Sequence, residues 1–292
     1  MEDYMRSQRE LSVREQEVNQ RIIRYQYGAK VYHYTSVASL VGILSKREIW
    51  LGNTATMNDK LEIVDFIEKL QNAVSVDINP EKIGVCNEFF DKLYNRLATE
   101  YPFAFSLSTL DDNAAQWERY ADDAHGVCIV FNTSVFMNLF LYSGAAFNKV
   151  FYQYDIRKHA HYKILKAYFN TGKLNELGTE VGEMDNLLGC AYMHKHESFC
   201  TESEIRLTNL WNRKIAKSEI GFEVINGKVK KVLKVSLKEL CNEENIDFED
   251  LIDKIVIAPR SEQNELELKE YLEFMGYRKL SNRIIKSRCP LR

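Results

Sequence analysis

The stretch Lys30-Val31-Tyr32-His33-Tyr34-Thr35-Ser36 places a histidine between two tyrosines in a short strand-like run. Because neighbouring residues of a strand point to opposite faces, His33 is expected to share a face with Thr35 and to point away from both tyrosines. An apolar helical pattern follows directly at residues 37–44. Polar groups at the end of a buried strand, with a helix following, commonly build a ligand site. Taken alone, the stretch also fits an ordinary half-buried strand with a hydrogen-bonded histidine.

Composition places the chain among soluble globular proteins. It has 292 residues, of which 45% are hydrophobic and 28% charged, enough for one large domain or two small ones. The net charge of -3 excludes a general polyanion binder, so contact with nucleic acid would need a local basic patch. The charged N-terminus does not resemble a signal peptide, and the apolar window at 135–147 is too short to cross a bilayer. We therefore expect a cytoplasmic protein without membrane contact.

Cysteine and histidine spacing argues against disulfide and metal frameworks. The 6 cysteines form no Cys-x-x-Cys pair and suit reduced thiols of a cytosolic protein. Residues two apart on a helix do not share a face, so neither His159 with His161 nor His194 with His196 and Cys200 forms a closed ligand set. We expect no metal site. Common nucleotide-binding loops, the Gly-x-Ser-x-Gly elbow and the His-Glu-x-x-His motif are also absent.

The order of predicted elements indicates an α+β fold with antiparallel or mixed sheets flanked by helices. Residues 1–28 are predicted to form a charged helical extension, and residues 29–292 a single domain. Asn226-Gly227 is a strong hairpin signal. Apolar spacing predicts helices over 37–45, 61–70, 80–100, 111–120, 133–141, 156–171, 180–198, 237–244 and 262–275. Strand patterns cover 30–36, 48–51, 103–108, 127–131, 149–153, 203–210, 221–224, 229–235, 255–257 and 284–285.

A second strand carries hydroxyl groups. Alternation over 103–108 puts small residues, among them Ser106 and Ser108, on one face, which leaves room for a ligand. In the helix that follows, Trp117 and Tyr120 are three residues apart and are expected to share a side. Simple packing would account for this pattern equally well.

A third strand carries charge. In an extended conformation Glu202, Glu204 and Arg206 would line one face. Two carboxylates this close should raise the pKa of one, while Arg206 should hold the other ionised. Such a carboxylate can stabilise a developing oxocarbenium ion when a glycosidic bond breaks. A solvated strand face with a surface ion pair is the alternative.

The order of these short motifs along the chain resembles a bacterial family known as domain of unknown function 2971. The resemblance covers about residues 30–292, and that family looks like a distant branch of the ADP-ribosyltransferase fold. The motifs are Tyr32-His33-Tyr34-Thr35, Asn58-Asp59-x-x-Glu62, Phe105-Ser106-Leu107-Ser108, Trp117-x-x-Tyr120, Gly126-Val127-Cys128-Ile129, Glu202-x-Glu204-x-Arg206 and Ser287-x-x-Pro290-x-Arg292.

The resemblance implies a site for NAD, used as a substrate. His33 would bond a ribose hydroxyl, with Thr35 supporting the same region. Ser106 would lie beside the nicotinamide ribose. Glu204 would bond that ribose and stabilise the oxocarbenium as nicotinamide leaves.

The same resemblance assigns three further roles. Glu202 would position or polarise the nucleophile of the target, and Arg206 would anchor the strand. An aromatic ring would stack on nicotinamide, and three candidates stay open: Tyr34, Trp117 and Tyr120. The sequence departs from the best-known members because it lacks their Ser-Thr-Ser strand and has no assignable tyrosine of a His-Tyr-Glu triad.

The function expected from this resemblance is NAD-dependent ADP-ribosyl transfer by a bacterial toxin or phage-defence effector. Its target would be RNA, DNA or protein, and an antitoxin or regulatory protein is a conceivable partner. A catalytically inactive nucleotide- or partner-binding module of the same fold is the alternative. Transfer of an RNA 2′-phosphate onto NAD would need more basic residues near His33 than Lys30. Lysines at 228–234 and basic residues at 278–292 could recruit nucleic acid, or simply solvate a sheet edge.

Overall fold

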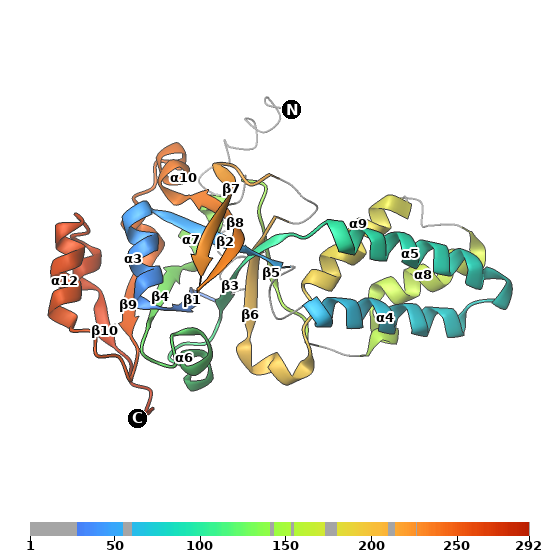
Figure 1. Cartoon of the computed structure of the whole chain (residues 1–292), viewed down its shortest axis with the longest axis horizontal. Coiled ribbons are helices and arrows are strands. Elements are labelled where there is room, and N and C mark those ends of the chain that lie inside the picture. Colours follow the sequence, from blue (N-terminus) through green and yellow to red (C-terminus); the bar gives the residue numbers. More distant parts are fainter. Residues whose placement is uncertain are drawn as a thin grey trace.

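The computed structural model describes residues 28–54, 60–140, 143–152, 155–172, 180–209, 214–225 and 227–291. The helix predicted at 1–28 falls outside them except for Gly28. Within the described residues the architecture is α+β, with one large mixed sheet flanked by helices (Figure 1). Among the described helices, none is both long and apolar enough to cross a membrane.

Within the described residues, the sheet has ten strands in the order β10-β9-β4-β1-β3-β2-β8-β7, with β6 added on β3 and β5 on β6. The described pairings are antiparallel except the parallel pair β9–β10. Gly227 closes the β7–β8 hairpin with a left-handed φ of 72°, as its turn requires. The strands are β1 Lys30–Thr35, β2 Glu48–Asn53, β3 Phe103–Ser108, β4 Val127–Asn132, β5 Ala146–Lys149, β6 Glu204–Thr208, β7 Ser218–Ile225, β8 Lys228–Ser236, β9 Ile252–Ile257 and β10 Ile284–Lys286.

Strand β3 is the branch point of the sheet. It pairs with β6 over five residues, from Ala104↔Thr208 to Ser108↔Glu204. It meets β1 only at Tyr32↔Ser108, and it meets β2 only at Gly52↔Ala104 and Asn53↔Phe103. Strands β1 and β2 therefore diverge from opposite ends of β3, and the sheet is open between them.

Helices cover both faces of this sheet. The main core lies on the face where Val31, Phe105 and Ile129 meet apolar residues of α3 Val37–Lys46, α7 Thr133–Phe140, α10 Leu237–Glu244, α11 Phe248–Leu251 and α12 Glu265–Phe274. A smaller cluster on the opposite face joins Tyr32, Tyr34 and Cys128 to Trp117 of α6 Ala114–Tyr120. The two-residue period of β1 thus separates the tyrosines from Val31, as the sequence predicts.

Four longer helices form a unit of their own beside the sheet (Figure 1). They are α4 Lys60–Asp77, α5 Ile83–Thr99, α8 Ala160–Thr171 and α9 Glu180–Tyr192, and they enclose a separate hydrophobic cluster that includes Phe66, Phe90 and Leu187. Short 3-10 turns occupy η2 Pro80–Lys82, η3 Ile156–Lys158, η4 Glu197–Glu202 and η6 Leu280–Asn282. The sequence shows no composition shift at the borders of this helical unit.

Several predicted boundaries are wrong for identifiable reasons. The strand expected at 149–153 is β5, which ends at Lys149, and the chain then makes only an isolated bridge from Phe151 to His194. The helix expected at 180–198 ends at Tyr192, and the next residues lead to η4. Polar and aromatic residues at 192–202 have helix-compatible propensities, but their tertiary contacts decide the backbone there.

Candidate functional site

A cavity of about 730 Å³ lies at the opening between β1 and β2. Its volume is within the roughly 300–1,000 Å³ range of small-molecule sites. The N-terminal half of α3 and parts of β3, α6 and β8 complete its lining. Of the residues predicted from sequence, these line it: His33, Tyr34, Thr35, Ser106, Tyr120, Glu202 and Glu204.

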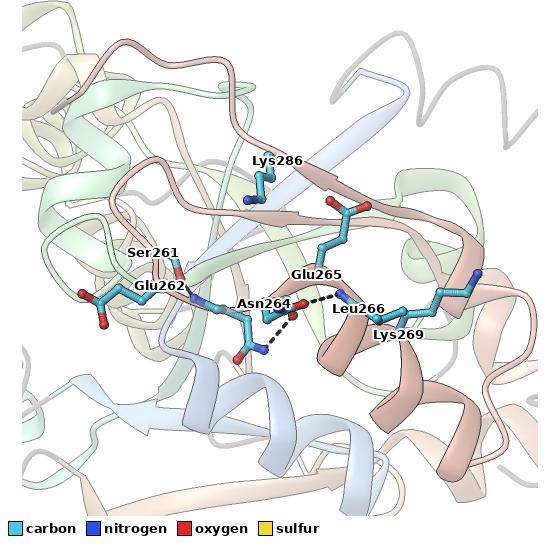
Figure 2. A pocket seen from close by; sticks show the side chains of 8 residues that line it. Ser261, Glu262, Asn264, Glu265, Leu266, Lys269 and Lys286 are labelled. Atoms are coloured by element: carbon cyan, nitrogen blue, oxygen red, sulfur yellow. Dashed lines mark hydrogen bonds between the residues drawn. The ribbon is translucent and has the colours of Figure 1, made fainter.

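A second hollow of about 610 Å³ lies at the start of α12 (Figure 2). Two of its polar side chains bond to the backbone of the loop and of the helix start. Ser261 accepts from the backbone N–H of Gln263, and Asn264 caps α12 by accepting from the N–H groups of Leu266 and Glu267. This hollow is an open surface feature that contains none of the residues predicted from the sequence, so the cavity between β1 and β2 is the better candidate site.

His33 contributes a neutral imidazole to the cavity. Its Nδ1 lies 3.0 Å from the backbone oxygen of Ser106, an acceptor, so Nδ1 carries the proton and Nε2 is the acceptor nitrogen. The ring stacks on Phe105 with centroids 4.2 Å apart. Burial lowers the pKa of His33 to about 4, against a weaker opposing effect of the bond to Ser106. Near neutral pH this side chain can accept a hydrogen bond from a ligand hydroxyl.

The neighbours of His33 support the same wall. Thr35 is buried at the end of β1, and Gly126 lies so close that a Cβ there would come within 2.2 Å of the Thr35 backbone oxygen. The Tyr34 hydroxyl donates to the Leu110 oxygen at 2.8 Å and accepts from the N–H of Asn113 at 3.2 Å. Tyr34 therefore also fastens the loop that leads to α6.

The carboxylate of Glu204 is buried and charged. Arg206, two residues along β6 on the same face, donates from Nε to Oε1 at 2.9 Å and from Nη2 to Oε2 at 3.1 Å. Burial alone would raise the pKa of Glu204, but Arg206 foremost, with Lys195 and a bond from Ser106, outweighs burial and lowers it to about 2. Arg206 is itself 1% exposed, lies behind the cavity wall, and donates from Nη1 to the Tyr192 oxygen at 2.7 Å.

Glu202 reaches the cavity by a route that strand periodicity does not predict. It belongs to η4, and Ser203 is in the left-handed region with a φ of 46°, so the strand begins only at Glu204. The prediction that Glu202 shares a strand face with Glu204 is wrong in its geometry. Its backbone oxygen is instead held by Ser108 at 2.8 Å and Gln116 at 3.1 Å, which turns the side chain into the site.

Lys195 joins the two carboxylates and has no signal in the sequence. Its Nζ lies 2.6 Å from Glu202 Oε2 and 3.3 Å from Glu204 Oε2, with all three side chains at most 8% exposed. It follows α9 and the Phe151–His194 bridge. Arg119 also contacts Glu202, at 3.0 Å, from a side chain that is 45% exposed. Two buried carboxylates are thus balanced chiefly by Lys195 and Arg206.

The two aromatic residues of α6 have different positions. The Tyr120 hydroxyl donates to Glu202 Oε1 at 2.7 Å and lines the cavity. Trp117 is fully buried, makes an edge contact with Tyr34 at 4.8 Å, and donates from its indole N–H to Asp112 at 2.8 Å. Trp117 is therefore a core residue that does not line the cavity, although it lies three residues from Tyr120 on the same helix. Trp50, which the sequence does not single out, lines the cavity instead.

The C-terminal motif that begins at Ser287 holds the end of the chain in place. Asp112 accepts hydrogen bonds from the Ser287 hydroxyl and from the Arg288 N–H, so the C-terminal segment is fastened to the loop before α6. Arg292 and residues 58–59 lie outside the described residues, as does the side chain of Glu62. Among the residues described, no three His, Cys, Asp or Glu side chains are grouped to hold a metal ion.

One comparison with known proteins gives a match in this region. A family model described as "Protein of unknown function (DUF2971)" matches residues 116–207, which include most of α6, Lys195 and the Glu202–Arg206 segment. The match supports the family resemblance over that segment. It does not extend to His33 or Ser106, and the family description names no activity. No curated protein and no solved structure matches the chain.

Proposed function

We propose that this protein is an NAD-dependent ADP-ribosyltransferase whose active site is the cavity between β1 and β2. The observation that carries the proposal is that His33, Ser106 and Glu204, from three different strands, line this one cavity. They supply an acceptor nitrogen, a hydroxyl and a permanently charged carboxylate. One dinucleotide can contact all three groups only if they share a single opening.

The lining suits the separate parts of NAD. Ser36, the N-cap of α3, and Ala38 and Ser39 of its first turn line the cavity, so the positive end of the helix would be near the pyrophosphate of NAD. Lys230 of β8 adds a positive charge to the cavity lining. The aromatic rings of Tyr34, Tyr120 and Trp50 offer surfaces for nicotinamide or adenine.

The chemistry we propose is cleavage of the bond between the nicotinamide ring and its ribose. The bonding electrons leave with nicotinamide, and a nucleophile of the target attacks the ribose carbon. Glu204 stabilises the positive charge that develops on the ribose, because its pKa near 2 keeps it ionised. Neutral His33 and Ser106 orient the ribose. Glu202 accepts hydrogen bonds from Tyr120 and Lys195. In this proposal it positions the nucleophile of the target.

The test is incubation of the protein with NAD labelled on its adenylate part and a bacterial cell extract. Transfer of label to a macromolecule, with release of nicotinamide, is expected for the wild type and is expected to fall at least about a hundredfold in Glu204→Gln. Glu262→Gln, at the hollow of Figure 2, is the matched control and should leave the rate unchanged. Equal rates for wild type and Glu204→Gln would overturn the proposal.

We further propose that the target is a nucleic acid or a protein with an acidic surface. Lys230 lines the cavity, and Lys228 and Lys231 are exposed on the same hairpin. At the other end of the sheet, Lys279 is paired with Asp247 and Asp250. Because Lys230 lines the cavity itself, the basic charge of this hairpin is better placed to receive a target than the paired Lys279. Nuclease and protease treatment of the labelled product separates the two target classes.

One observation favours a second function, a binding module that retains the cavity but does not turn NAD over. Both oxygens of Glu204 accept bonds from Arg206, and Glu202 has three charged or hydroxyl donors. Carboxylates so fully paired can serve a purely structural network. Saturable NAD binding by calorimetry, with no nicotinamide released, would select this alternative.

A further inference from the structure

A second cluster of reactive groups lies in the helical unit, away from the cavity. His161 near the start of α8 faces two residues of α9, Glu183 and Cys190, which are seven positions apart and so share a helix face. His161 Nδ1 lies 2.6 Å from Glu183 Oε1, and its Nε2 lies 3.3 Å from Cys190 Sγ. A carboxylate, an imidazole and a thiol are thus aligned in the order used to activate a cysteine.

The charge at this cluster favours a thiolate. Burial would lower the pKa of His161, but its bonds to Cys190 and Glu183 outweigh burial and raise it to about 9. His159 is a further titratable group beside the ring, stacked at 5.4 Å, and its own pKa is lowered by burial and by the charge on His161. An imidazolium in contact with a cysteine sulfur stabilises the ionised thiol.

The remaining cysteines lack this arrangement. Cys86, Cys128 and Cys241 are buried, and burial raises the pKa of each thiol. Cys200 is exposed and Cys289 partly exposed, and within the described residues neither bonds to a histidine. Cys190 combines partial exposure with a charged histidine partner.

The surroundings indicate the size of the reagent. Cys190 lies inside α9, where the backbone N–H groups are engaged in helix hydrogen bonds and do not form an oxyanion hole. Neither of the two hollows described above includes it. A small oxidant can reach a partly exposed sulfur, whereas an acyl substrate would need a binding groove.

We propose that Cys190, with His161 and Glu183, is a thiol that reacts with hydrogen peroxide. The thiolate sulfur attacks one peroxide oxygen, an S–O bond forms and the O–O bond breaks. The sulfur is oxidised by two electrons to a sulfenic acid, and the peroxide is reduced to hydroxide. Hydroxide takes the proton from the His161 imidazolium and leaves as water.

The first test is alkylation of the reduced full-length protein with iodoacetamide, followed by peptide mass spectrometry. At about pH 6, Cys190 is expected to react at least tenfold faster than exposed Cys200, because the His161 ring contacts the sulfur of Cys190. Its rate should change little between about pH 8 and pH 6, where an unassisted thiol slows roughly tenfold per pH unit. A Cys190 rate no faster than that of Cys200, or one that falls with pH as Cys200 does, overturns the proposal.

The second test uses variants and hydrogen peroxide. His161→Gln should slow alkylation of Cys190 at least about tenfold at that pH and leave Cys200 unchanged, while His125→Gln, at an exposed histidine, should change neither rate. Trapping with dimedone should mark sulfenic acid at Cys190 in the wild type and much less in His161→Gln. Equal trapping in the two proteins would contradict a role for His161. The pH profile of the wild type decides the proposal even if His161→Gln does not fold.

Discussion

His33 is held as a neutral imidazole, although histidine ordinarily titrates near pH 6.5. Burial against Phe105 and the fixed bond to the Ser106 backbone oxygen produce this state. It matters for the proposed function because only a neutral ring offers Nε2 as an acceptor. The protonated ring would present two donors and lose that contact.

We predict that His33 titrates near pH 4 in the folded protein. In the unfolded chain the His33 imidazole takes up a proton below about pH 6.5. The contribution of neutral His33 to the free energy of unfolding is therefore complete above pH 6.5 and is lost as the pH falls from 6.5 to 4. Histidine NMR signals followed against pH measure the pKa, and His33→Gln assigns the signal. His194, whose pKa is also lowered to about 4, titrates in the same window and must be assigned separately. A midpoint near 6.5 for His33 would contradict this account of the site.

Arg206 is predicted to be among the most sensitive positions of the chain. Arg206→Met would leave the buried Glu204 carboxylate without its bidentate partner and should lower the free energy of unfolding by about 3–5 kcal/mol. Lys92→Met, which breaks the exposed pair with Glu180, is the control and should have a much smaller effect. Urea denaturation measures both. Similar losses in the two variants would show that the Glu204–Arg206 pair is not buried as described.

At the scale of elements, helix α3 presents small residues to the cavity. Gly42 lies in its interior, and a Cβ built there meets nothing within 4 Å. Gly42→Ala should therefore raise the free energy of unfolding by about 0.5–1 kcal/mol, since glycine is a poor residue for a helix interior. Thermal and urea denaturation test this. A loss of stability would mean that the space beside Gly42 is filled.

The start of β6 depends on one residue in a left-handed conformation. Ser203→Val should cost about 1–2 kcal/mol because a β-branched side chain is strained at a φ of 46°. Ser203→Gly should be neutral or stabilising for the same reason. Denaturation of the two variants gives the comparison. If valine were tolerated as well as glycine, position 203 would not need the left-handed conformation. Strand β6 could then begin at Glu202, as the sequence pattern alone predicts.

Most strands and helices could be predicted because their period in the sequence is local. The alternation in β1 and β3 correctly separates Tyr32 from Val31 and the serines from Phe105. The position of Glu202 could not be predicted, because it depends on the left-handed Ser203 and on anchors from β3 and α6. Lys195 carries no local signal at all, since only the fold of the helical unit brings it to β6.

At the scale of the whole molecule, the helical unit and the sheet meet through the charged network. The chain leaves α9, supplies the Tyr192 oxygen to Arg206 and Lys195 to both glutamates, and then enters β6. The candidate site therefore includes groups from both parts of the protein. The four-helix unit has its own hydrophobic core, but the amino-acid composition does not change at its borders. Its contribution to the site, Lys195 and the Tyr192 oxygen, is therefore visible only in the folded structure.

The central claim is that NAD is cleaved in the cavity between β1 and β2, and nicotinamide release tests it most directly. Gly42→Phe is expected to fill the cavity without disturbing the paired carboxylates, and Gly84→Phe is the matched control in α5, where a Cβ also meets nothing within 4 Å. In the presence of the bacterial cell extract that supplies the target, we predict nicotinamide release from NAD by the wild type and by Gly84→Phe, and its loss in Gly42→Phe. Absence of release from the wild type, or equal release from Gly42→Phe, would contradict the account.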